Sequence, residues 1–392
     1  MKQDLKMQAI AKNILHNLAA STKSKTYTFT KIADTSGLFS KFGYGTSINN
    51  AGVVAFQAAA LLKGARYGIF TGDGDAITKI VDTGRLFKGF ACPALNDAGV
   101  VAFLAGLKTG GKGIFTSDGR DITQIAETGE EFCWFSGTPS IDSTSKVAFW
   151  AALKGGGEGI FTGSDRHLTK IADTDNSFSA LASPSINNQG MVAFRAALKQ
   201  GGYGIFTGNG DAIALIADTT NSFSWFAHPC INDAGNVTFL AYPTGGGYGI
   251  FKGNGEKISK IAHTSGCLSH FASPSLNNAS AIAFRAKPGA KGEGIFITAG
   301  SKAKKVIAVG DHLFDAKISS LIFSPGGFNN SGQIAFYACF TDGTSGIFRA
   351  EPVVLPVDTV FEATSQHQKN RISNYAKIAL PMHPRSQNPI PV

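Results

Sequence analysis

Short apolar and polar segments alternate in a fixed order along most of the chain. The triplet Gly-Ile-Phe occurs seven times, at intervals of 45, 46, 45, 45, 45 and 52 residues. A segment such as VAF precedes each triplet, an IADT-like segment follows the first six, and one more IADT copy at Ile32 precedes them all. This recurrence predicts seven tandem units of one supersecondary structure.

Each unit predicts four short strands. In residues 183–219 the segments SPSIN, MVAFRAAL, YGIFTG and AIALIADT are separated by the turns NNQG, KQGG and GNGD, whose Asn and Gly tolerate positive φ. A longer connection leads to the next unit. Seven such units predict an all-β, seven-bladed β-propeller with four antiparallel strands per blade and the SPSIN-like strand innermost. The strand near Thr28 is expected to close the ring as the outer strand of the last blade.

Two extensions flank the predicted propeller of residues 27–350. In residues 1–26, Met7, Ile10, Ile14 and Leu18 have helical spacing among basic residues, which predicts a short amphipathic helix. Such a helix either caps the propeller or docks on an anionic protein or membrane surface. Residues 351–392 contain six Pro and cannot pair into a sheet. They form either a disordered tail or an extended arm that orders on a partner.

Composition narrows the class of protein. A chain with 47 Gly, 30 Phe and 16% charged residues suits many short strands. No apolar run approaches the ~18 residues of a membrane helix. Five scattered Cys without a CxxC motif favour a reducing compartment, and residues 1–26 lack a continuous apolar signal segment, so we expect a cytoplasmic protein. The net charge of +9 is dispersed, which argues against nucleic acid as a partner.

The predicted axis of the ring offers little for catalysis. The innermost segments, such as TPSID, SPSIN and HPCIN, are small and nearly equivalent, whereas catalysis needs groups with different roles. His228, His263 and His270 could bind zinc but match no known ligand spacing. We therefore expect no catalytic residue, metal or cofactor. An Asn or Asp recurs at the same position of all seven units. These side chains either open the hairpin turns or hold a cation or water at the mouth of the channel: Asn49, Asn96, Asp142, Asn187, Asn232, Asn277 and Asn329.

Candidate partner-binding residues gather in the predicted inter-blade connections and in the turns between the second and third strands, which we expect on one face. Aromatic and cationic side chains together are typical of interface anchors. The candidates are Trp134, Trp225, Phe226, His228, His270, Lys63, Arg66, Lys108 and Lys112.

The segments NNAGVVAF (49–56) and NDAGVVAF (96–103) resemble the NxxGxxAF tandem-repeat proteins common in cyanobacteria and other bacteria. The resemblance covers about residues 27–350, although the third unit has DSTSKVAF instead. It implies a propeller but carries no established chemistry. No catalytic residue is therefore transferred to this chain.

These observations favour a non-catalytic scaffold or assembly component that holds protein partners through one loop face and both extensions. Two alternatives remain open. The first is a carbohydrate-binding module using Trp134 and Trp225, and the second is a metal-dependent hydrolase or lyase using the axial channel.

Overall fold

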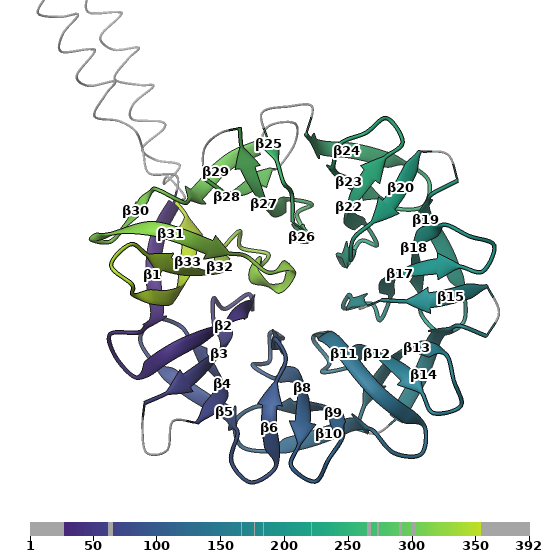
Figure 1. Ribbon diagram of the computed structural model, residues 1–392, viewed down its shortest axis with the longest axis horizontal. Helices are drawn as coiled ribbons and strands as arrows, with labels where there is room; N and C mark the ends of the chain where they lie inside the picture. Colours follow the sequence, from purple (N-terminus) through teal and green to yellow (C-terminus); the bar gives the residue numbers. More distant parts are fainter. Residues whose placement is uncertain are drawn as a thin grey trace, which may run out of the picture. The chain divides into compact units, whose positions relative to one another are not determined.

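The computed structural model describes residues 27–353, except 62–65, 166, 176, 183, 221, 265–267, 273, 290–291 and 299–302. Seven antiparallel sheets are arranged in order around a central axis (Figure 1). They form a seven-bladed β-propeller. Within the described residues, no helix has the length and hydrophobicity needed to cross a membrane.

The blades follow one another along the chain, and in blades one to six the second, third and fourth strands lie progressively farther from the axis in sequence order. In blade seven the outermost strand is β1, which precedes all the other strands in the sequence. Blades one to three comprise β2 (Phe39–Ile48), β3 (Val54–Ala60), β4 (Tyr67–Gly72) and β5 (Ile77–Asp82); β6 (Phe87–Phe90), β7 (Ala94–Leu95), β8 (Val101–Leu107), β9 (Lys112–Ser117) and β10 (Ile122–Glu127); and β11 (Phe132–Ile141), β12 (Val147–Leu153), β13 (Glu158–Ser164) and β14 (His167–Asp173). Blades four and five comprise β15 (Phe178–Leu181), β16 (Ser185–Ile186), β17 (Val192–Leu198), β18 (Tyr203–Gly208) and β19 (Ile213–Asp218); and β20 (Phe223–Phe226), β21 (Cys230–Ile231), β22 (Val237–Pro243), β23 (Gly249–Gly253) and β24 (Ile258–His263). Blades six and seven comprise β25 (Leu268–Ser269), β26 (Ser275–Leu276), β27 (Ile282–Pro288), β28 (Gly294–Thr298) and β29 (Ala303–Ala308); and β30 (His312–Leu313), β31 (Ala316–Ile322), β32 (Ile334–Phe340), β33 (Ser345–Pro352) and β1 (Tyr27–Asp34).

The expected bounds of the inner strand need correction. The sequence predicts that the inner strand begins at the SPSIN-like segment, but in the structure it begins earlier, at the Phe-containing segment of the predicted connection. A bulge or break follows, so four blades carry two short inner strands paired with one second strand, as β6 and β7 pair with β8. The expected N-terminal helix lies outside the described residues, whose only helix is the 3-10 turn η1 (Pro325–Gly327).

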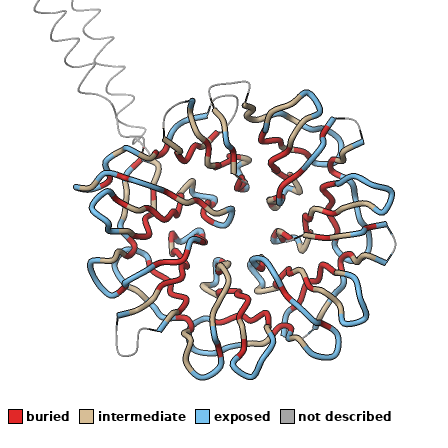
Figure 2. Tube along the Cα trace, in the orientation of Figure 1, coloured by how far each residue is buried: buried red, intermediate tan, exposed pale blue. Residues whose placement is uncertain are grey.

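Phenylalanine fills the core between the blades. In blade one, Phe39, Phe56 and Phe70 pack with ring centroids 4.9–6.1 Å apart, and Phe56 is fully buried. Most other blades repeat this arrangement, as Phe87, Phe103 and Phe115 do in blade two. The second and third strands are buried on both faces because neighbouring blades cover them, whereas exposure concentrates in the peripheral loops (Figure 2).

The Gly of each Gly-Ile-Phe triplet allows a bulged outer strand to approach. The register between third and fourth strands shifts just after this Gly, as between Ile69 and Phe70 in blade one. A Cβ on Gly68 would lie 2.6 Å from the carbonyl oxygen of Val81, closer than real Cβ atoms come. The recurring Gly therefore serves backbone proximity at the bulge.

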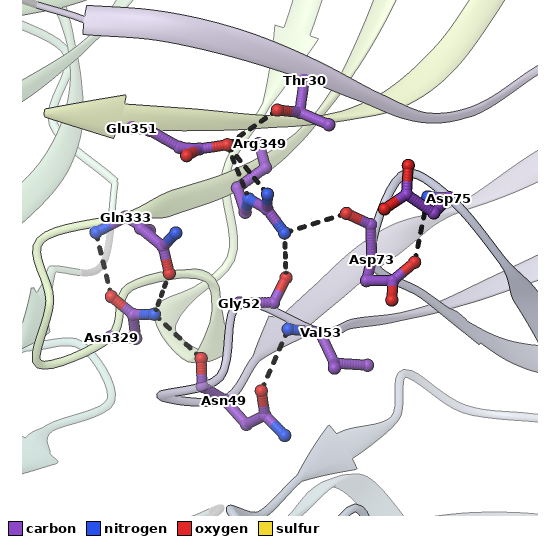
Figure 3. Close-up of polar contacts among 10 residues, drawn as sticks. All are labelled: Thr30, Asn49, Gly52, Val53, Asp73, Asp75, Asn329, Gln333, Arg349 and Glu351. Atoms are coloured by element: carbon purple, nitrogen blue, oxygen red, sulfur yellow. Dashed lines mark hydrogen bonds and ion pairs between the residues drawn. The ribbon is translucent and has the colours of Figure 1, made fainter. Parts of the chain in front are cut away.

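The first and last strands of the repeat region lie in one sheet. β1 pairs antiparallel with β33, from Tyr27 opposite Pro352 to Asp34 opposite Gly346. Arg349 of β33 donates to Glu351 and also to the carbonyl oxygens of Gly52 and Asp73 in blade one, while Thr30 of β1 donates to the same Glu351 carboxylate (Figure 3). One guanidinium thus connects the last blade to the first.

Candidate functional site

A ring of asparagine side chains surrounds the axis at the turns between the first and second strands. Each side-chain oxygen accepts a hydrogen bond from its own turn, as Asn49 Oδ1 does from the Val53 amide. Each side-chain amide donates to the main-chain carbonyl of the corresponding Asn or Asp in the next blade. Six such bonds, of 2.8–3.2 Å, join Asn49 to Asn96, Asn96 to Asp142, Asn187 to Asn232, Asn232 to Asn277, Asn277 to Asn329, and Asn329 to Asn49.

The next residue of each turn forms a second ring on the solvent side. Its main-chain N–H donates to the side-chain oxygen of its counterpart in the following blade, as Asn188 does to Asp233 at 2.9 Å. The turn prediction for the Asn and Asp residues is therefore correct but incomplete, because the same side chains also connect the blades. The sequence shows that Asn recurs at this position, but it does not show that the side-chain amide donates to a main-chain carbonyl of the next blade.

Blade three interrupts both rings. Asp142 uses Oδ1 to cap its own turn through the amides of Thr144 and Lys146, but its carboxylate has no N–H to donate to Asn187. In the second ring, Ser143 occupies the position of the longer Asn or Asp side chains, and no bond from the Asp97 amide to Ser143 occurs between these two described residues. The unusual segment DSTSKVAF accounts for both gaps.

The axial opening contains a hollow of about 150 Å³ that is open to solvent and is lined by these Asn and Asp side chains and by apolar residues such as Ile48 and Leu95. Within the described part of the chain, no three His, Cys, Asp or Glu side chains lie close enough to hold a metal ion. His228, His263 and His270 therefore do not converge on a zinc site. The imidazole of His263 contacts the carbonyl oxygen of Gly246 instead, at 3.1 Å.

The opposite ends of the inner strands carry most of the candidate partner-binding residues. There the turns between blades lie beside the turns between second and third strands, because main-chain hydrogen bonds join them, from Lys108 to Leu86 and from Lys154 to Glu131. We call this side of the ring the connection face. The expectation that both sets of turns share one face is confirmed.

Trp134 is exposed on the connection face. It lies in β11 with 51% of its surface accessible, and the ammonium group of Lys112 from blade two lies 3.4 Å from its ring centroid. Lys112 also donates to the carbonyl oxygen of Phe135 at 3.3 Å. Burial lowers the pKa of this ammonium below its ordinary value. The pair forms a cation–π contact across the boundary between blades two and three.

Trp225 belongs to a second aromatic group on the same face. Its ring stands perpendicular to that of Tyr248 at 6.5 Å, and Tyr248 stands perpendicular to Tyr242 at 5.1 Å. Trp225 and Tyr248 are 38% and 44% exposed. In neighbouring blade four, Arg195 lies 5.5 Å from the ring centroid of Tyr203. The sequence analysis missed these Tyr residues, although Tyr precedes the Gly-Ile-Phe triplet at 67, 203 and 248.

Polar side chains beneath this surface hold neighbouring blades together. Gln57 of blade one donates to the carbonyl oxygen of Phe90 at 3.0 Å, and Arg195 of blade four donates to that of Phe226 at 3.2 Å. Arg285 of blade six makes the same contact with Leu321 of blade seven. The three acceptor residues lie just beyond the bulge of the next inner strand and are register partners of its second strand.

The remaining candidates are less suited to contact a partner. Phe226 is fully buried in β20, so its assignment as a contact residue is wrong: its ring packs between the blades. Arg66 forms an ion pair with Asp82 at 3.5 Å, and Lys108 donates to the carbonyl oxygen of Gly84. His228 and His270, by contrast, are exposed, in blades five and six, and stay candidate contact residues. Lys63 lies outside the described residues.

A model of a family of unknown function, DUF7453, matches residues 17–173 and again 169–360. The chain belongs to this family. No curated protein matches the chain.

Solved structures with a similar arrangement are β-propellers with low sequence identity. The β-propeller domain of the Trilobed protease from Pyrococcus furiosus is 10% identical with a TM-score of 0.56, and the match covers 80% of this chain and 99% of that domain. An acylaminoacyl peptidase from Pyrococcus horikoshii (10% identity, TM-score 0.54) and a puromycin-hydrolysing peptidase from Mycobacterium tuberculosis (10%, 0.52) are matched over 84% and 83% of this chain. The chain spans 55% of each of these two peptidases. These likenesses establish the fold alone.

Proposed function

We propose that this DUF7453 protein is a non-catalytic scaffold that binds protein partners through its connection face. The observation that carries the proposal is the pair of exposed aromatic groups on that face, Trp134 with Lys112 and Trp225 with Tyr248. Rigid aromatic rings flanked by cations lose little conformational entropy on binding and often anchor interfaces.

The environment of these side chains supports the same role. Each tryptophan is followed by a residue whose carbonyl oxygen accepts a hydrogen bond from the preceding blade, Phe135 from Lys112 and Phe226 from Arg195. The surface is therefore organised before a partner arrives, which reduces the cost of association. The turn-capping Asn side chains at the axis provide no pair of groups with distinct acid and base roles.

The proposal is tested by affinity capture from the native lysate, with the full chain as bait. Trp134→Ala/Trp225→Ala is expected to lose specific partners that wild type retains. Ile258→Ala is a matched control, because Ile258 is also 38% exposed but lies on the outer strand β24. If the double variant and the control capture the same proteins as wild type, or if wild type captures none, the proposal fails.

Carbohydrate binding is the second candidate function, favoured by the group of Trp225, Tyr242 and Tyr248. Perpendicular, partly exposed rings offer flat apolar surfaces on which a sugar can stack. A glycan array probed with wild type and Trp225→Ala separates the two functions. A signal that disappears in Trp225→Ala supports sugar binding, and an array without signal removes this candidate.

A further inference from the structure

The outer edge of blade four differs from the edges of the other six blades. Its outermost strand, β19, exposes Ile213, Ala214 and Leu215 in succession, and Ile213 and Leu215 are 44% and 46% accessible. β19 pairs with β18 on one side only, and no other described strand pairs with it. The strand therefore presents apolar side chains together with unpaired main-chain groups.

The register identifies the residue that distinguishes this edge. In every blade one residue of the outermost strand lies opposite the Phe of the Gly-Ile-Phe triplet. In blade four that residue is Leu215, opposite Phe206. In the other blades the residue is Lys79, Gln124, Lys170, Lys260, Lys305 and, on β1, Lys31.

Lysine on an edge strand prevents sheets from adding to one another, because pairing would bury or juxtapose ammonium groups. Several of these lysines are also engaged locally, as Lys79 is with Asp82 at 3.0 Å and Lys305 with Asp311 at 2.9 Å. Leu215 provides neither a charge nor an ion pair. Of the seven outermost strands, only β19 and the Gln124-bearing β10 lack a charged side chain at this position, and only β19 has an apolar one.

We propose that two copies of the protein associate by antiparallel pairing of their β19 strands about a twofold axis at Ala214. In this register Ile213 of one copy lies opposite Leu215 of the second copy on the same face of the extended sheet. The apolar surfaces are thereby self-complementary, as a twofold interface requires. If two β5 strands paired in the same register, Lys79 would lie opposite Ile77 of the second copy, so an ammonium group would be placed against an apolar side chain.

One feature limits the strength of this contact. The bulge between Ile205 and Phe206 interrupts the regular register of β19 beyond Leu215, so the segment available for pairing is short. A small interface corresponds to weak, concentration-dependent association. The edge of blade four lies across the ring from blade seven, which contains both Tyr27 and Pro352 (Figure 1).

Sedimentation equilibrium of the full chain over a wide concentration range tests the proposal. Wild type is expected to shift from monomer toward dimer as concentration rises, whereas Leu215→Lys, which restores the residue of the sister blades, remains monomeric. Ile258→Lys adds the same charge to the edge of blade five and is expected to dimerise like wild type. A monomer at every concentration, or equal association of wild type and Leu215→Lys, overturns the proposal.

Cross-linking tests the register independently. Ala214→Cys places a thiol at the twofold axis, where opposed strand residues lie within disulfide range. The matched control is Thr169→Cys, which occupies the same register position on blade three, opposite Thr162 as Ala214 lies opposite Thr207. Peptide mapping should find a 214–214 disulfide between copies and no 169–169 disulfide. Equal yields at the two positions, or no disulfide at 214, contradict the proposed pairing.

Discussion

The side-chain amide of Asn329 donates to the main-chain carbonyl of Asn49 at 2.8 Å, across 280 residues of sequence. This bond repeats, between the last blade and the first, the contact found at five other blade boundaries. The boundary between blades three and four is the exception, because Asp142 has a carboxylate where the others have an amide.

Replacing Asp142 with Asn should complete this ring and stabilise the protein. Asn retains the oxygen that caps the turn at Thr144 and Lys146 and adds the N–H that can reach the carbonyl of Asn187. One additional hydrogen bond should raise the free energy of unfolding by about 1 kcal/mol, measured by urea denaturation. Asp97→Asn is the matched control. Both Asp97 oxygens accept bonds from Asn50, so this variant should gain nothing. An equal gain in both variants would mean that charge removal, rather than the new donor, is responsible.

Replacing Gly68 with Ala should destabilise the ring. The added Cβ would meet the carbonyl oxygen of Val81 at 2.6 Å, and a main-chain atom cannot move aside cheaply. We expect a loss of roughly 1–3 kcal/mol in the free energy of unfolding, seen as a lower urea midpoint. Gly89→Ala is the control, because nothing lies within 4 Å of its Cβ position. A loss at Gly89 equal to that at Gly68 would contradict the proposed role of the bulge.

Replacing Arg349 with Ala should weaken the joint between blades seven and one. The substitution removes bonds to Gly52 and Asp73 and leaves the Glu351 carboxylate, with 30% of its side chain exposed, without its cation. The expected cost is about 2 kcal/mol. Arg66→Ala removes an exposed ion pair and should cost no more than about 0.5 kcal/mol. Comparable losses in the two variants would show that the joint does not depend on Arg349.

The same joint should make stability depend on pH in the acid range. Burial raises the pKa of Glu351, but hydrogen bonds from Thr30 and Arg349 and the charge of Arg349 lower it to a net value below the ordinary 4.5. A lowered pKa in the folded state means that the carboxylate contributes fully above pH 4.5 and loses its contribution as pH falls through the folded value.

Thermal unfolding measured from neutral to acid pH tests this dependence. Glu351→Gln should be less stable than wild type at neutral pH and should lose less stability on acidification. Parallel curves for the two proteins would exclude Glu351 as a source of acid sensitivity.

The repeat made most of the propeller predictable. Seven Gly-Ile-Phe triplets and regular turns indicate the number of blades and the order of strands, because both are local properties of the sequence. The start of each inner strand was not predictable: Phe87 and Phe90 flank a bulge, and their pairing with β8 depends on a strand that follows them. Nor does composition indicate that an Asn side chain reaches the next blade, or that Phe226 is covered while adjacent Trp225 is not.

Tyr27 and Pro352 are register partners, although more than three hundred residues separate them. Both ends of the propeller therefore leave from a single corner, beside blade seven. A reporter domain fused before Tyr27 and another fused after Pro352 would be delivered to the same place. In such a fusion protein the two added domains would be attached next to each other beside blade seven, and neither would be attached to the opposite side of the ring.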